Sequence, residues 1–118
     1  MKLDLTTTFT DRNGRAIVKT GEESKGQVMT LSDVLMLALD WFEDPKSATG
    51  EQKYKRYKII EKVKDGEDDF TVEEVMTMKE AVSAHPFVPF VHGQIVDLLD
   101  QKKPKLTAIK GGEKSGNT

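Results

Sequence analysis

The sequence predicts a mostly helical α+β domain, in which an N-terminal β-hairpin precedes a four-helix core and a disordered C-terminal tail. Three observations predict it: apolar and polar residues alternate near the N-terminus, four later segments carry apolar residues at helical spacing, and residues 111–118 include no apolar side chain. The chain has 118 residues, the length of one ordinary domain, so we expect a single compact domain over residues 1–101.

The hairpin is predicted over residues 2–18. The pattern is the period-two alternation of a half-buried strand, in which Leu3, Leu5, Thr7 and Phe9 alternate with Asp4, Thr6 and Thr8. Asn13-Gly14 is a strong signal for a two-residue turn, because both positions tolerate positive φ. Residues 15–18 would return as the second strand, and the hairpin should pack against the helices because a lone hairpin is marginal in water.

The helices are predicted at about residues 31–42, 51–64, 72–84 and 90–101. Thr30 is the expected N-cap of the first, and a capping box from Thr71 to Glu74 opens the third. The first helix is apolar on nearly every side, so it should lie at the centre of the core or cover a partner surface. We expect the three later helices to wrap around it.

Charge is distributed unevenly along the chain. The net charge is −2, but five lysines and one glutamate follow Asp100, so the flexible basic tail over residues 102–118 carries +4 and residues 1–100 carry −6. An acidic body repels nucleic-acid phosphates, which disfavours general nucleic-acid binding by the folded part.

The chain has no cysteine, which excludes disulfides, thiolate catalysis and the common zinc sites. A secreted domain of this size often needs a disulfide, so we expect a reducing cytoplasm as its location. No apolar run resembles a signal peptide or reaches the ~18 residues of a membrane span.

No pattern of residues indicates catalysis, a metal site or a cofactor. Residues 65–74 resemble a calcium loop in outline, but Val63 and Asp68 stand where a ligand aspartate and a turn glycine belong. His85 and His92 are the only histidines, too few for a zinc site without further ligands at suitable spacing. We therefore expect a protein that is not an enzyme and that uses no metal or cofactor.

Two features are candidate partner-binding residues. The second helix interleaves cations with tyrosines (Lys53, Lys55, Arg56 and Lys58), and the first ends in Trp41-Phe42. Because Tyr54 and Tyr57 share helical spacing with Ile60, both tyrosines are expected to face the core, which would leave the cations as a solvated helix face. The alternative is that the cations bind an acidic protein patch or nucleic acid, while large aromatics are either core residues or interface anchors.

Several of these segments together are similar to small uncharacterised accessory proteins of tailed bacteriophages and prophages. The resemblance covers about residues 3–100 and rests on packing and capping motifs at Leu31 to Leu39, Lys53 to Tyr57, Thr71 to Glu80 and Pro89 to Leu99. It implies a host-cell cytoplasmic context and action by binding another macromolecule, and it implies no site residue.

The resulting hypothesis is a non-enzymatic phage accessory protein that binds a host or phage protein and inhibits a host enzyme or defence complex. The alternatives are a nucleic-acid-associated protein that uses the basic helix and the lysine-rich tail, and a virion assembly component. A membrane partner is not expected, and a homodimer remains open.

Overall fold

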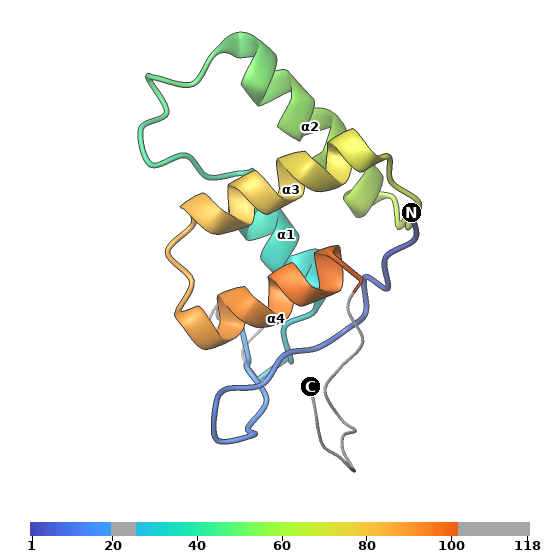
Figure 1. The fold of residues 1–118 in the computed structure, drawn as a ribbon, viewed down its shortest axis with the longest axis vertical. Helices are drawn as coiled ribbons and strands as arrows, with labels where there is room; N and C mark the ends of the chain where they lie inside the picture. The colour runs from blue at the N-terminus through green and yellow to red at the C-terminus, as the bar shows by residue number, and fades with distance from the viewer. Residues whose placement is uncertain (20–25, 102–118) are drawn as a thin grey trace.

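The computed structural model describes residues 1–19 and 26–101, which form four helices (Figure 1). They are α1 (Leu31–Leu39), α2 (Gly50–Lys64), α3 (Val72–Ala84) and α4 (Pro89–Leu99). The four predicted helices are present, although α1 ends at Leu39 and α4 at Leu99, both earlier than expected. The predicted flexible tail, residues 102–118, lies outside the described residues.

Side-chain hydrogen bonds determine where three of these helices begin. Each of α1, α2 and α3 opens with a capping box, in which a threonine and the side chain three residues later each accept a backbone N–H. The Thr30 cap and the Thr71 box confirm the sequence prediction. α4 begins instead with Pro89 in its first turn, where the missing proline N–H costs no helical hydrogen bond.

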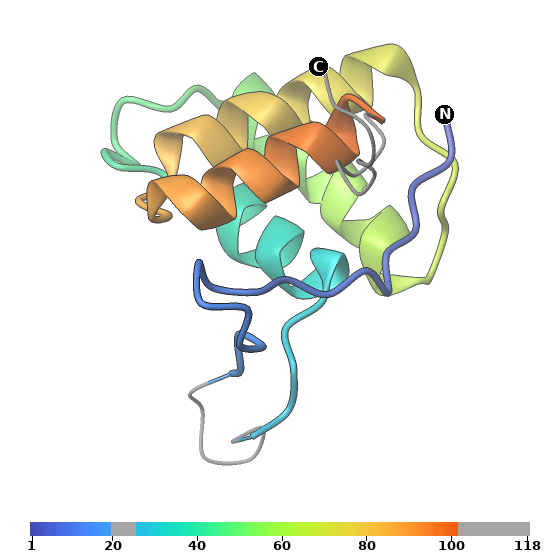
Figure 2. The same cartoon turned by 60° about the horizontal axis from the view of Figure 1, so that its bottom comes forward.

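α3 and α4 lie side by side and antiparallel, α1 lies beneath them, and α2 packs against α1 and α3 (Figures 1 and 2). The core is built from one apolar face of each helix, from Leu3 and Phe9 of the N-terminal segment, and from Phe70 of the α2–α3 connection. Of the three helices expected to wrap α1, α2 and α3 make the main contacts with it, and α4 packs mainly on α3. Burial of each large apolar side chain contributes about 1.5–3 kcal/mol.

The predicted N-terminal β-hairpin is wrong, because residues 1–19 and 26–101 contain no strand and no sheet. The chain does reverse direction at the predicted turn, where the Asp11 N–H donates to the Arg15 carbonyl at 2.8 Å and Gly14 has φ +82°. Beyond that turn the pairing is limited to isolated bridges, Thr10 with Ala16, Val18 with Val28 and Thr8 with Thr30.

Two local features explain why a continuous strand does not form. The Asp4 carboxylate accepts hydrogen bonds from the Thr6 N–H (3.0 Å) and the Thr6 hydroxyl (2.6 Å), which turns the chain where the strand should run straight. The carbonyls of Leu5 and Thr7 are also committed elsewhere, since they accept the first two N–H groups of α1 at 3.1 and 2.8 Å. The segment therefore supplies hydrogen-bond partners to a helix end, which otherwise leaves its first N–H groups unsatisfied.

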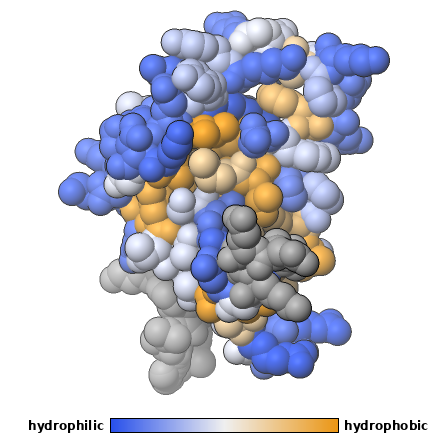
Figure 3. Space-filling view, turned by 180° about the vertical axis from the view of Figure 1, so that it is seen from behind, coloured by the Kyte–Doolittle hydropathy of each residue, from blue (hydrophilic) through white to orange (hydrophobic). Residues whose placement is uncertain are grey.

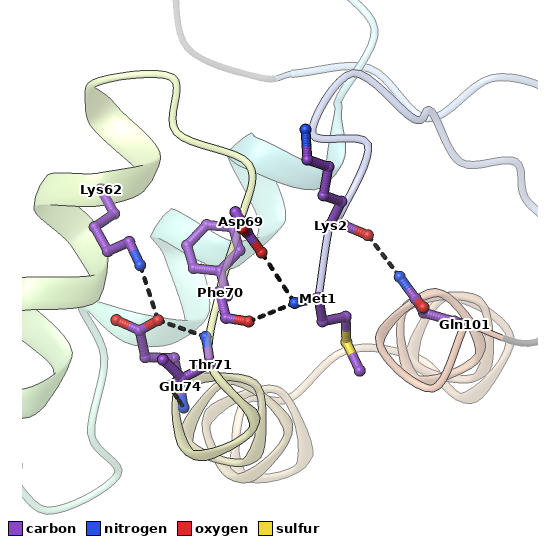
Figure 4. A network of polar contacts seen from close by, with 8 residues as sticks. All are labelled: Met1, Lys2, Lys62, Asp69, Phe70, Thr71, Glu74 and Gln101. Carbon is purple, nitrogen blue, oxygen red and sulfur yellow. Dashed lines mark hydrogen bonds and ion pairs between the residues drawn. The ribbon is translucent and has the colours of Figure 1, made fainter.

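The start of the chain lies between the α2–α3 connection and the end of α4 (Figure 4). The Met1 nitrogen is 2.9 Å from both Asp69 Oδ1 and the Phe70 carbonyl oxygen, and the Phe70 N–H donates back to the Met1 carbonyl at 2.8 Å. On the other side, Gln101 Nε2 donates to the Lys2 carbonyl at 2.5 Å. These contacts join residues that are 68, 69 and 99 positions apart in the sequence.

Phe70 anchors this junction in the core. Its side chain is 2% exposed, and the Lys62 ammonium lies 4.9 Å from the centre of its ring. Lys62 is held in turn by Glu74, 2.9 Å away, whose carboxylate also accepts the Thr71 N–H in the α3 capping box. The pKa of Glu74 is lowered because these two hydrogen bonds and the lysine charge outweigh the effect of partial burial.

None of the helices within the described ranges is both long and apolar enough to cross a membrane.

Replacement of Phe70 by alanine is expected to lower the free energy of unfolding by about 3–5 kcal/mol, because it removes a fully buried ring and leaves a cavity. Val72→Ala, two residues away at a side chain that is 68% exposed, should change it by less than about 0.5 kcal/mol. Urea unfolding monitored by circular dichroism measures both. Equal effects of the two substitutions would contradict the burial of Phe70.

Candidate functional site: the outer face of helix α2

Helix α2 turns its two tyrosines towards solvent. Tyr54 is 61% exposed and Tyr57 is 52% exposed, so the prediction that both face the core is wrong. The buried side chains are Ile59 and Val63, and Arg56 is partly buried one turn before Ile59 on the same side. Residues at i, i+3 and i+7 share one helix face, so the inward face begins with an arginine and the tyrosines lie opposite it.

The two tyrosines lie next to each other and are joined to a charged pair. Their ring centres are 5.9 Å apart, and the Lys58 ammonium is 6.0 Å from the centre of the Tyr54 ring. Glu61 Oε1 lies 3.2 Å from Lys58 Nζ, and Glu61 Oε2 accepts the Tyr57 hydroxyl at 3.1 Å. One carboxylate therefore holds a lysine and a tyrosine in fixed positions on the outside of the helix.

These contacts shift the ionisation of all three groups. The pKa of Glu61 is lowered by hydrogen bonds from Lys58 and Tyr57, which favour the carboxylate. The same carboxylate raises the pKa of Tyr57 and the pKa of Lys58, because it accepts hydrogen bonds from their protonated forms and so stabilises those forms. The groups lie in solvent, so their hydrogen bonds and ion pair order the side chains but add little to the stability of the fold.

Lys53 and Lys55 flank the tyrosines, one on each side. Both are exposed, and neither forms an ion pair within the described residues. With Tyr54, Tyr57 and Lys58 they make up a continuous exposed face, which we call the α2 surface. It combines two tyrosine rings with three ammonium groups, and the Glu61 carboxylate lies next to Lys58 and Tyr57.

Three other predicted binding residues contact one another inside the chain. Arg56 Nη1 donates to the carbonyl oxygens of Trp41 (2.8 Å) and Ala38 (3.4 Å), and its guanidinium carbon lies 3.9 Å from the centre of the Phe42 ring. Burial lowers the pKa of Arg56, and the charge of Glu80 partly opposes that shift. Arg56 thus satisfies carbonyls at the end of α1, where a positive charge is favourable.

Trp41 also belongs to a cluster of aromatic rings around His85. The His85 ring lies edge-on to Trp41 at 5.2 Å and stacks on Phe87 at 4.3 Å between ring centres. Its Nδ1 atom is buried and has no hydrogen-bond partner among the residues that the structure describes. Burial lowers the pKa of His85 below its usual 6.5, because removing the ring from water disfavours its charged form.

The second histidine lies near a serine but lacks the rest of a catalytic arrangement. His92 Nε2 is 3.5 Å from Ser83 Oγ, a long separation for a hydrogen bond between a hydroxyl and an imidazole. Within residues 1–19 and 26–101 no salt bridge involves a histidine, so no carboxylate is in place to orient the ring as a base. The same residues contain no group of three or more side chains that would hold a metal ion.

Open clefts also lie between elements of the described part of the chain, and two of them are large. One, of about 620 Å³, lies between the N-terminal segment and the ends of α1 and α2, with Leu5, Val63 and Asp68 among its lining residues. The other, of about 750 Å³, lies between the turn at residues 11–13 and the start of α4, where Val88 and Phe90 are exposed.

A further apolar area lies on the side opposite the view of Figure 1. Figure 3 shows apolar side chains in the middle of that side, surrounded by hydrophilic ones. On α1, Leu37 is 48% exposed, whereas most apolar side chains of that helix are buried. A single exposed leucine is normal for a protein surface and indicates no site.

Comparison with known proteins gave no relatives: no family model, no curated protein and no solved structure matches this chain.

Replacement of Arg56 by alanine should lower the free energy of unfolding by about 1–3 kcal/mol, because the carbonyls of Ala38 and Trp41 lose a charged donor. Lys55→Ala, at an exposed neighbour on the same helix, should change it by less than about 0.5 kcal/mol. Thermal or urea unfolding of the two variants makes the comparison. Arg56 would be an ordinary surface cation if both substitutions were equally mild.

His85 is expected to make stability fall in acid. Because its pKa is lowered in the folded state, the unfolded chain binds the proton more readily, and stability is lost as pH falls below 6.5. The loss approaches about 1.4 kcal/mol per pH unit and ends at the folded-state pKa. Unfolding of the wild type and of His85→Phe, compared from about pH 7.5 to about pH 5, isolates this contribution. Parallel pH profiles of the two proteins would show that His85 does not titrate differently on folding.

Proposed function

We propose that this chain is a non-catalytic protein-binding module that docks through the α2 surface. The observation that supports the proposal is the exposure of two neighbouring tyrosines, 61% and 52%, in the middle of a helix face that packs against nothing else in the described chain. Tyrosine is enriched among residues that dominate binding energy, since its ring covers much area with little loss of side-chain freedom.

The charges around the tyrosines indicate the chemistry of the partner. Lys53, Lys55 and Lys58 bring three ammonium groups to the edge of the rings, and two of them have no intramolecular ion pair within the described residues. A partner that offers carboxylates around an apolar or aromatic centre would complement this pattern. Such pairs at an interface edge mainly raise the association rate and select the partner.

Binding to nucleic acid is the second candidate, supported by the same lysines and by tyrosines on which bases would stack. Two observations favour a protein partner instead. Residues 1–100 carry a net charge of −6, and the Glu61 carboxylate lies among the lysines, where phosphates would approach.

The cellular context is proposed on the sequence alone. The resemblance to phage and prophage accessory proteins suggests a host or phage protein as the partner, and a host enzyme or defence complex that is blocked when its surface is covered. The lack of cysteine is typical of proteins that work in a reducing compartment, so we propose the cytoplasm as the location.

The proposal predicts that Tyr54→Ser combined with Tyr57→Ser reduces capture of the partner at least about thirtyfold, the effect of losing one strong interface anchor. Both side chains are exposed, so the temperature of unfolding should change little. Affinity capture with the full chain from cells of the organism that carries the gene, with quantitative mass spectrometry, measures the recovery.

Met76→Ser is the matched control, because Met76 is an apolar side chain that is 58% exposed on a different helix. Capture that survives the double substitution, or that is lost equally in the control, would reject the α2 surface. An oligonucleotide that binds the chain and is released steeply by added salt would establish the second candidate instead.

A further inference from the structure

The cleft of about 620 Å³ opens where the described part of the chain ends. At the end of α4, Gln101 adopts φ 57°, a left-handed conformation that ends the helix and redirects the backbone. Its side-chain amide donates to the Lys2 carbonyl at 2.5 Å (Figure 4), and Lys2 is one of the residues that line the cleft. The segment that follows Gln101 therefore starts at the edge of this cleft.

The lining of the cleft is acidic in balance and partly apolar. Asp4 and Asp68 outnumber Lys2 among its charged residues, and the connection from which Asp68 comes is acidic along most of its length, from Asp65 to Asp69. The Asp68 carboxylate is exposed and has no ion pair in residues 1–19 and 26–101. Leu5 and Val63 contribute apolar surface to the lining.

The sequence after Gln101 is complementary to this cleft. Residues 102–118 carry +4, with lysines at 102, 103 and 105, and their apolar side chains of any size are Leu106 and Ile109. An extended chain covers at most about 3.3–3.6 Å per residue, so Leu106 can reach about 17 Å from Gln101. That reach spans a cleft whose edge begins at Gln101.

The second cleft is a poorer fit for the same segment. It lies at the start of α4, about 16 Å along the helix axis from Gln101, a distance that Leu106 covers only with the intervening chain fully extended. Its charged lining residues, Asp11 and Arg12, are of opposite sign, so it offers a cationic segment no net attraction.

We propose that residues 102–110 of the same chain bind across the cleft between the N-terminal segment and the ends of α1 and α2. The lysines pair with the carboxylates of its lining, Asp68 above all, and Leu106 with Ile109 covers Leu5. The segment is tethered at Gln101, so a weak contact is sufficient to keep it bound for much of the time. This inference is independent of the function proposed for the α2 surface.

The absence of cysteine allows a direct test in the full chain. Ala108→Cys carries a nitroxide spin label, and the broadening of backbone amide signals in a ¹⁵N-labelled sample reports which residues the label approaches. We expect selective broadening at Thr6, Ser32 and Gly66, which line the cleft, and little at Asn13 or Val88, which line the other one.

Two substitutions in the labelled chain test the charges. Asp68→Asn should reduce the broadening up to about fivefold, the effect of losing one exposed ion pair. Glu43→Gln removes the same charge from an exposed position that does not line the cleft, and it should leave the broadening unchanged. Replacing the lysines at 102, 103 and 105 with glutamine should act as Asp68→Asn does.

Three outcomes would overturn the proposal. The first is broadening spread evenly over the domain, and the second is broadening centred on the cleft at Val88. The third comes from a mixture of two samples, if a nitroxide-carrying chain without ¹⁵N broadens the signals of ¹⁵N-labelled chains that carry no nitroxide. The last result would place the segment of one copy on another copy.

Discussion

Helix α1 is short and nearly all apolar, so it is not stable as a helix exposed to water. The rest of the molecule packs around it and buries most of its apolar side chains. A helix of nine residues is far below the length at which isolated helices form, so its stability comes from packing. α2 and α3 pack on its sides, and both of its ends receive hydrogen bonds from distant residues. The carbonyls of Leu5 and Thr7 accept its first N–H groups, and Arg56 donates to carbonyls at and beyond its last turn.

This arrangement divides the residues of α2 between two tasks. Arg56, Ile59 and Val63 face α1 and hold the core together, so their substitution affects folding. Tyr54 and Tyr57 face away from it, and no contact of the core depends on them. A helix divided in this way can change its outer side chains without loss of stability, which is what a surface adapted to one partner requires. The aromatic cluster of Trp41, His85 and Phe87 adjoins this inward group, because Arg56 binds the Trp41 carbonyl.

The sequence was sufficient to predict where the helices lie, but it was insufficient to predict which face of α2 is buried. Thr30 and Thr71 mark helix starts by local chemistry, which a sequence shows directly. The orientation of α2 could not be read in that way, since Tyr54, Tyr57 and Ile60 have helical spacing too, and only contact with the α1 carbonyls makes a charged Arg56 face inward. The prediction for the N-terminal segment was wrong for a similar reason. Its alternating pattern is typical of a strand, but the turn at Asp4 and the unsatisfied N–H groups at the start of α1 redirect its hydrogen bonds.

The isolated bridges of the N-terminal segment have a consequence for how copies of the chain behave at high concentration. A threonine-rich stretch with alternating apolar residues would, as an edge strand, present a regular row of unpaired N–H and C=O groups on which another molecule could add a strand. Here the backbone changes partner almost every second residue, from the α2–α3 connection to α1 and then to residues 16–18 and 28–30. Without a continuous row, the segment gives no template for intermolecular β-sheet growth, and the protein is protected from aggregation at the point where its sequence most resembles a strand.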